Sequence, residues 1–406
     1  METAADFRRE KGLALSKDKR IAEIVSGTWA VPSQSANAVY LVNESAATCT
    51  CPDFESRHQR CKHQWAIELR KTVETAPDGT TTVTESVKFT RKTFSQDWPK
   101  YNQAQVAERE TVMALLRGLC ADVETPAHTG RGPKPIPMGD VVFGLVSKVY
   151  STVSGRRAAS TIKACETSGH IGRAPAYNTL FRYFADPVMT EILTHMIEKS
   201  AAPLATVEGA FSVDSTGFST SVYHCWWSHK HQKEIKSSKW LKAHCCAGNL
   251  TGIVASVSVT EGKTHDATEL AGLVDSASER FTMAEVSADR AYLSGVNLDA
   301  IEATGATPLI PFKSNSTASG NPAWRRMHAH FTLKEDEFLA AYRQRSNVES
   351  TFSAIKRRFG GALRSKTFTA QKNEVLAKIL CHNLAVLCHA MHELGIASPF
   401  AAPEVA

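Results

Sequence analysis

The pattern of apolar residues changes near residue 205, and this change restricts the folds that the chain can adopt. From about residue 97 to 200 the apolar residues recur at helical spacing, whereas after residue 205 short apolar runs typical of strands alternate with helical segments. The later order is three strands, helix, strand, helix, strand and helix, which predicts a mixed sheet covered by helices. The expected strands are Phe211-Ser-Val-Asp and residues 241–247, 253–260, 283–288 and 307–312.

The chain divides into segments of different character. The first is expected to contain loops and short strands, including strands at 28–32 and 38–42. The second is expected to contain helices, the third the mixed sheet and its helices, and the last a flexible tail. The fold class is therefore α/β, with a small α+β module and an all-α domain before the sheet. The expected boundaries are 1–90, 91–203, 204–395 and 396–406.

Two long helices, about 335–359 and 371–393, are expected to close the sheet domain after an irregular polar stretch at 313–333. No run of the chain approaches the roughly 18 unbroken apolar residues that a membrane span requires. The first ten residues lack the apolar core of a secretory signal, so no membrane partner is expected.

A compact group of cysteine and histidine residues lies in the first segment. Cys49 and Cys51 are separated from Cys61 and His63 by nine residues, and thiolate and imidazole are ligands that Zn²⁺ favours. Four such ligands form a closed structural site, so we expect zinc to stabilise a module with little apolar core. The alternative is four unrelated residues. Arg57, Arg60 and Lys62 fit phosphate contact, although a solvated surface explains them equally well.

A second group of cysteines and histidines does not match a compact zinc pattern. Its later residues, His244 to Cys246, fall on an expected strand, where successive side chains point to opposite faces. We therefore interpret this group as structural. Its members are His224, Cys225, His229, His231, His244, Cys245 and Cys246.

The helical segment contains a helix, a glycine-containing break at 168–172 and a second helix near 176–184. This order is compatible with a helix-turn-helix that reads DNA through Asn178, Thr179 and Arg182. A plain helical linker domain is an equally good interpretation, because many helical bundles have the same pattern.

One helix near the C-terminus carries a glutamate between basic residues. Tyr342 and Arg345 stand seven and four residues before Glu349, and Lys356 stands seven residues after it. At about 100° per residue these side chains share one helix face. A second, apolar stripe about 90° away is expected to be buried on the sheet, and it consists of Val348, Phe352, Ile355 and Phe359. Residues 343–372 contain eight Lys or Arg and one acid, a net +7, whereas the whole chain has 47 basic and 41 acidic residues, a net +6. This local excess, which includes Arg357 and Arg358, favours contact with a polyanion.

Two further acids stand where strands are expected to end, Asp214 after Phe211-Ser-Val and Asp289 after residues 285–288. Ligand sites of α/β sheets commonly form there. If these carboxylates converge with Glu349, their mutual repulsion requires a hard cation. Mg²⁺ or Mn²⁺ prefers such oxygen ligands, and a pair of these ions can activate water and stabilise the leaving 3′-oxygen of a phosphodiester.

These residues carry a family resemblance. Tyr342-x2-Arg345-x3-Glu349-x6-Lys356 resembles the signature of DDE-type insertion-sequence transposases, and Asp289-Arg-Ala-Tyr and Val213-Asp214-Ser-Thr resemble the family's aspartate motifs. The resemblance covers about residues 205–392. In the first segment, the Cys-x-Cys and Cys-x-His pairs resemble the SWIM zinc finger, a module associated with DNA or protein binding.

The transposase resemblance implies a ribonuclease H-like fold and a metal-dependent enzyme that cuts double-stranded DNA and joins the 3′-hydroxyl to a target. It implies metal-binding catalytic roles for Asp214, Asp289 and Glu349, and DNA positioning by Tyr342, Arg345 and Lys356. We also expect a homodimer or higher oligomer in a prokaryotic cytoplasm, associated with the nucleoid. The alternatives are an inactive DNA-binding regulator, or a ribonuclease H-like nuclease without strand transfer.

Overall fold

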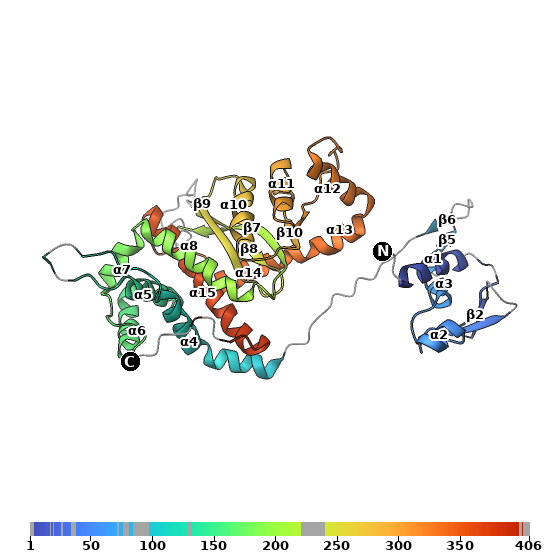
Figure 1. Ribbon diagram of the computed structural model, residues 1–406, viewed down its shortest axis with the longest axis horizontal. Helices are drawn as coiled ribbons and strands as arrows, with labels where there is room; N and C mark the ends of the chain where they lie inside the picture. Colours follow the sequence, from blue (N-terminus) through green and yellow to red (C-terminus); the bar gives the residue numbers. More distant parts are fainter. Residues whose placement is uncertain are drawn as a thin grey trace, which may run out of the picture. The chain divides into compact units, whose positions relative to one another are not determined.

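The computed structural model describes most of the chain in two compact units, Met1–Thr93 and Phe94–Ala406 (Figure 1). Each unit is described by itself. The described residues are 4–16, 18, 20–25, 27–33, 38–70, 73–75, 81–83, 97–128, 131–132, 134–220, 240–397 and 400.

The first unit combines an antiparallel sheet with helices. Strands β1 (Ala22–Val25), β2 (Thr28–Pro32), β3 (Val39–Asn43) and β4 (Thr48–Cys49) pair in that order, and helices α2 (Pro52–Arg57) and α3 (Lys62–Arg70) follow. A hairpin of β5 (Val73–Thr75) and β6 (Thr81–Val83) comes next. The expected strands at 28–32 and 38–42 are confirmed to within one residue.

Helix α1 (Ala4–Ser16) was not expected, because the N-terminal segment was read as strands and loops. Charged residues dominate its first half, so its sequence shows little helical periodicity. Its backbone approaches α3 closely at Gly12, where a Cβ atom would lie 2.5 Å from Cβ of Trp65. Tertiary packing therefore stabilises this helix more than its own pattern does.

The second unit begins with helices that share one hydrophobic core with the sheet. The expected helical domain is therefore packed into the same unit as the sheet, and of the expected tail at 396–406, Ile396 and Phe400 pack against this core. The helices are α4 (Trp98–Cys120), α5 (Met138–Tyr150), α6 (Gly155–Thr167), α7 (Tyr177–Phe184) and α8 (Val188–Ala201), followed by the short turn η1 (Ala202–Leu204).

The sheet has the order β11-β10-β7-β8-β9. Strands β7 (Ala210–Ser219), β8 (Trp240–Gly248) and β9 (Val254–Glu261) are antiparallel neighbours, whereas β10 (Glu285–Ala288) and β11 (Thr307–Leu309) run parallel to β7. The expected mixed sheet is confirmed. Helices α10 (Leu270–Ser278) and α11 (Gly295–Ala303) lie on one side of it, and α8, α14 (Ser346–Phe359) and α15 (Phe368–Leu394) lie on the other (Figure 1).

Two expectations for the C-terminal half were wrong. The stretch 313–333 is not irregular throughout, because it contains α12 (Pro322–Leu333), which Asn321 caps by accepting a hydrogen bond from the backbone of Trp324. The helix expected at 335–359 is divided into α13 (Glu335–Tyr342), the 3₁₀ turn η4 (Arg343–Arg345) and α14. Helical periodicity continues almost unchanged through a 3₁₀ turn, so the sequence pattern does not reveal the division.

Helix α15 is long and apolar enough to cross a membrane by length and composition, and 72% of its most apolar window is buried inside the protein. It is a core helix. Its Asn383 accepts a hydrogen bond from the backbone N–H of Val254 and donates one to the carbonyl of the same residue, at 2.9 and 2.8 Å. These bonds satisfy backbone groups of β9, which is an edge strand of the sheet.

His382, also on α15, makes the stability of the second unit sensitive to acid. Its Nε2–H donates to the carbonyl of Gly252 at 2.9 Å, and burial lowers the pKa of His382 from 6.5 to about 4. Between these values the unfolded chain binds more protons, so stability rises with pH through this window and is lost as pH falls. We expect about 2 kcal/mol of unfolding free energy to be lost between about pH 7 and pH 5 through this group.

Urea unfolding at both pH values checks this expectation. His382→Gln keeps an amide donor for the carbonyl of Gly252 and should remove about 2 kcal/mol from the loss of unfolding free energy between about pH 7 and pH 5. His195→Gln, at an exposed position of α8, should leave that loss unchanged. An unchanged pH dependence in His382→Gln would contradict the assignment.

Candidate functional site

The first candidate site is formed by the four expected zinc ligands. Cys49 ends β4, Cys51 caps the N-terminus of α2, and Cys61 and His63 flank the start of α3. All four are buried, and their ligand atoms lie within 4.8 Å of one another. Nδ1 of His63 lies 3.9 Å from Sγ of Cys49 and 3.8 Å from Sγ of Cys61. Such separations match the edges of a tetrahedron with metal–ligand bonds of roughly 2.0–2.3 Å.

Local hydrogen bonds hold these ligands in place. The backbone N–H of Phe54 donates to Sγ of Cys51 at 3.4 Å, which is the capping bond of α2. Gln64 accepts from the backbone of Cys61 at 3.0 Å and donates to the carbonyl of Ala47 at 2.7 Å. Hydrogen bonding from Cys49, and then from His63, lowers the pKa of Cys61, as a metal-binding thiolate requires. The donor set and its geometry therefore fit zinc.

The second cysteine–histidine group behaves as a structural element where it is described. His244 is buried in β8, its Nε2 lies 2.8 Å from Oγ1 of Thr260, and Cys245 and Cys246 are buried in the sheet. Among the described residues, the four zinc ligands of the first unit, the zinc quartet, are the one group of cysteine and histidine side chains close enough together to enclose a metal ion. His224, Cys225, His229 and His231 lie outside the described residues.

The second candidate site lies where β7 and β10 diverge. The two strands pair in parallel up to Val213 and Ala288, so Asp214 and Asp289 are the next residues on neighbouring strands. Neighbouring strands stand about 4.8 Å apart, which brings the two carboxylates to one edge of the pairing. Asp289 follows β10 as expected. Asp214 does not end its strand, however, because β7 continues to Ser219 by pairing with β8.

Arg345 links Glu349 to Asp214. One guanidinium nitrogen of Arg345 lies 2.9 Å from Oδ2 of Asp214, and another lies 2.8 Å from Oε1 of Glu349. Glu349 stands in the first turn of α14, and the apolar stripe of this helix is buried as expected. That stripe consists of Val348, Phe352, Ile355 and Phe359.

The electrostatics show that like charges converge here. Burial raises the pKa of Asp214. The negative charges of Asp289 and Glu349 raise it further, whereas the positive charge of Arg345 opposes the rise. Arg345 supplies one positive charge between two carboxylates, and its Nε is buried without a hydrogen-bond partner among the described residues. The three acidic side chains therefore lie near one another with Arg345 among them, although their oxygen atoms do not meet as closely as the ligand atoms of the zinc quartet.

The predicted DNA-contact residues have different surroundings. The ring of Tyr342 stacks on Phe338 at 6.4 Å, and Nζ of Lys356 lies 5.5 Å from the ring centroid of Phe218. Arg357 is exposed.

Arg358 is bound to a buried acid. Its guanidinium bonds to both carboxylate oxygens of Glu108, which is buried in α4, and to the hydroxyl of Tyr150 at 3.3 Å. This ion pair joins α4 to α14 and gives Arg358 a structural role that the sequence pattern did not reveal.

The helices proposed to read DNA are present as α6 and α7, separated by residues 168–176. In α7, Leu180 and Phe184 are buried, whereas Asn178 and Arg182 are exposed and Thr179 is half-buried. DNA contact through these three residues remains a prediction.

Comparison with known families assigns two regions of the chain. The fold and the quartet define a zinc-finger module joined to a mixed α/β domain. Residues 206–384 match the family described as Transposase DDE domain, and residues 37–71 match the SWIM zinc finger. The chain therefore carries a DDE transposase domain and an N-terminal SWIM zinc finger, which confirms the resemblance. No curated protein matches the chain.

Proposed function

We propose that this protein is a DNA transposase whose catalytic residues are Asp214, Asp289 and Glu349. The observation that carries this proposal is their convergence: parallel register pairs the positions of the two aspartates, and Arg345 joins Asp214 to Glu349. The strand order β11-β10-β7-β8-β9, with three antiparallel strands followed by two parallel ones, supports a ribonuclease H-like fold.

The proposed reaction has two steps. In the first, water attacks a phosphodiester at the element end and leaves a free 3′-hydroxyl. In the second, that hydroxyl attacks a phosphodiester of target DNA. Mg²⁺ or Mn²⁺ bound by the three carboxylates would supply activation of the attacking oxygen and stabilisation of the leaving one.

The chain's own side chains have separate roles in this proposal. The three carboxylates would hold the cations, and Arg345, which bonds to Asp214 and Glu349, would be available to bind a phosphate beside them. Tyr342, Lys356 and Arg357 contact the DNA backbone. Arg358 is left out because Glu108 already holds it.

Several further features belong to the proposal. The protein would act on double-stranded DNA as a homodimer or higher oligomer, because two element ends must be held together, and it would work in a prokaryotic cytoplasm. The SWIM module would bind zinc and contact DNA or a protein partner. We propose that residues 1–90, 91–203 and 204–395 serve as the zinc, helical and catalytic segments, respectively.

An assay with labelled DNA that carries the repeats flanking the reading frame tests the function. In Mg²⁺ we expect nicked ends and joined products, and in EDTA neither. Nicking without joined products would favour a ribonuclease H-like nuclease without strand transfer. Binding without nicking in either metal would favour an inactive DNA-binding regulator.

A further inference from the structure

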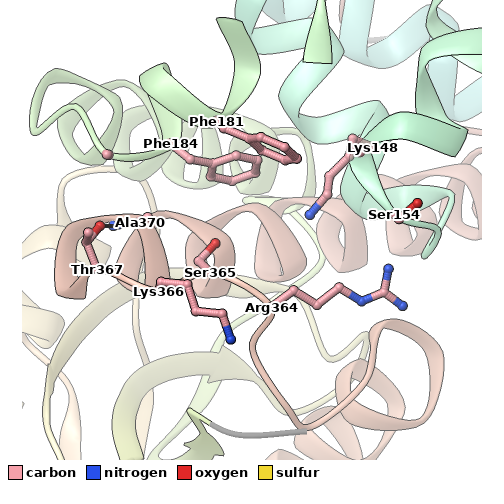
Figure 2. Close-up of a pocket in the computed structure, with 11 residues that line it drawn as sticks. Lys148, Ser154, Phe181, Phe184, Arg364, Ser365, Lys366, Thr367 and Ala370 are labelled. Atoms are coloured by element: carbon pink, nitrogen blue, oxygen red, sulfur yellow. Dashed lines mark hydrogen bonds between the residues drawn. The ribbon is translucent and has the colours of Figure 1, made fainter. Parts of the chain in front are cut away.

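A cavity of about 430 Å³ lies in the second unit, between helices α5, α6 and α7 and the segment that leads into α15. Its size is in the range of small-ligand sites. Figure 2 shows the rings of Phe181 and Phe184 on one side of the space, Ser365 and Lys366 on the facing side, and Lys148 directed between them. None of the side chains proposed for catalysis lines it.

Lys148 is a buried lysine whose side chain points into the cavity. It is 6% exposed, and its ammonium lies 5.1 Å from the centroid of the Phe184 ring. Among the described residues it forms no hydrogen bond or salt bridge. A buried ammonium without a hydrogen-bonded anion is unfavourable, so burial lowers the pKa of Lys148, and the negative charge of Glu374 only partly opposes this shift. An anion in the cavity would supply a directly bonded partner.

The facing wall adds positive charge. Arg364 and Lys366 line the cavity, and no carboxylate lines it. The nearby Glu374 is already engaged, because it accepts hydrogen bonds from the backbone N–H groups of Arg364 and Ser365 at 2.9–3.1 Å. The cavity therefore has three cationic side chains without an acid beside them in its lining.

Two helix N-termini strengthen this preference for an anion. Thr367 caps α15 and Ser154 caps α6, and both caps line the cavity. The N-terminal end of a helix carries a partial positive charge and free backbone N–H groups, which favour phosphate.

The aromatic wall indicates more than inorganic phosphate. Phe184 is buried, whereas Phe181 is 47% exposed, although it stands beside charged groups. Gly155 permits this position, because a Cβ atom there would lie 2.5 Å from Cζ of Phe181. An exposed aromatic ring next to a cationic pocket is the combination by which proteins bind an unstacked base and its phosphate.

We propose that this cavity binds one unstacked nucleotide of a DNA strand, with its phosphate at Lys148, Arg364 and Lys366 and its base against Phe181. A base stacked within a duplex cannot reach the aromatic wall, so the cavity takes single-stranded DNA. The assignment to DNA rests on the proposed function. The cavity-lining segment begins five residues after Phe359, the end of α14, and Phe359 lies about 15 Å along the helix from Glu349. One bound strand would therefore run from the cavity toward the proposed site of cleavage.

Fluorescence anisotropy with a labelled single strand of about ten nucleotides, in EDTA, tests the proposal. Lys148→Met should weaken strand binding about tenfold, because a charge-assisted bond to phosphate is lost. Phe181→Ala should weaken it by a similar factor of about ten, because base stacking is lost. Duplex affinity should change less than about twofold in both variants, since a paired base stays outside the cavity.

Lys163→Met, an exposed lysine on α6, is the matched control and should leave strand affinity unchanged. Thermal unfolding checks the fold: Lys148→Met should keep a Tm close to that of the unaltered protein, because methionine keeps the apolar stem and Glu374 keeps its hydrogen bonds to the backbone of Arg364 and Ser365. Phe181 is partly exposed, so Phe181→Ala gives a second test if Lys148→Met does not fold.

Unchanged strand binding in either folded variant would overturn the proposal, and so would an equal loss of duplex binding. A stronger thermal shift by free thymidine monophosphate than by the strand would overturn the assignment to DNA. The readout needs no cleavage, so its outcome is separate from that of the proposed function. Normal nicking with unchanged strand binding would refute only the cavity, whereas absent nicking with Lys148-dependent strand binding would refute only the transposase activity.

Discussion

Replacing Asp289 with asparagine should lower the rate of DNA cleavage about 1,000-fold or more while leaving DNA affinity within about twofold. A divalent cation stabilises the transition state by several kcal/mol, and each 1.36 kcal/mol corresponds to a tenfold change in rate. Asparagine removes one negative charge from the set formed with Asp214 and Glu349 but keeps the same shape. The substitution should therefore weaken cation binding and slow the chemical step, and it should leave DNA binding almost unchanged.

The fold should tolerate this change. Oδ1 of Asp289 accepts a hydrogen bond from the backbone N–H of Arg290 at 2.6 Å, at the start of the short turn η3 (Arg290–Tyr292). Asparagine has an oxygen for the same bond and is an equally good capping residue. Thermal unfolding should show a Tm close to that of the unaltered protein.

Asp275→Asn is the matched control, because Asp275 is an exposed acid on α10. It should cleave at the unaltered rate. Cleavage by Asp289→Asn within about tenfold of the unaltered rate would remove Asp289 from the proposed catalytic set. Loss of end binding together with cleavage would indicate a structural role instead.

Removal of zinc should unfold the SWIM module and leave the second unit folded. The small core of the first unit includes Cys49, Cys51 and Cys61 themselves, so metal binding and folding are coupled there. Structural zinc in small modules contributes about 10–16 kcal/mol of apparent binding free energy, far more than so small a core supplies. Chelation should abolish protease protection over residues 45–70 and leave that of the sheet intact.

Hydrogen exchange or limited proteolysis, with the zinc content measured in parallel, checks this result. Cys61→Ser should reproduce the effect of chelation. His58→Asn should not, because His58 is an exposed neighbour with φ 48°, a conformation that asparagine accepts. Unchanged protection of residues 45–70 after complete zinc removal would show that the quartet is not a structural metal site.

The local patterns predicted much of the fold and of both candidate sites. Strands separated by turns, and the spacing of Cys49, Cys51, Cys61 and His63, depend on neighbouring residues, so they can be read along the chain. The stripe of α14 was predicted for the same reason. Helices α1 and α12 were missed because contacts with distant residues stabilise them, and those contacts leave little periodicity in their own sequences.

The surroundings of single charged residues were less predictable. The basic run from 343 to 372 was expected to meet DNA as a whole, yet Arg358 pairs with Glu108, 250 residues away in sequence. Lys148 left a weak signal, since it is a lone lysine in the apolar run 141–149. Nothing local showed that its ammonium faces a cavity or that Arg364 and Lys366 stand across from it.

By itself, the sequence determined the kinds of ligand atom that the chain offers: four soft-to-borderline donors at short spacing, and three carboxylates on separate strands and helices. Only the tertiary structure decided which groups meet, because parallel pairing of β7 with β10 and burial of α14 against the sheet join residues far apart along the chain. It also decided that Arg345 bridges two acids and that the ammonium of Lys148 lies over the Phe184 ring, with no hydrogen-bonded anion among the described residues. Contacts of this kind depend on distance in space, which spacing along a chain does not specify.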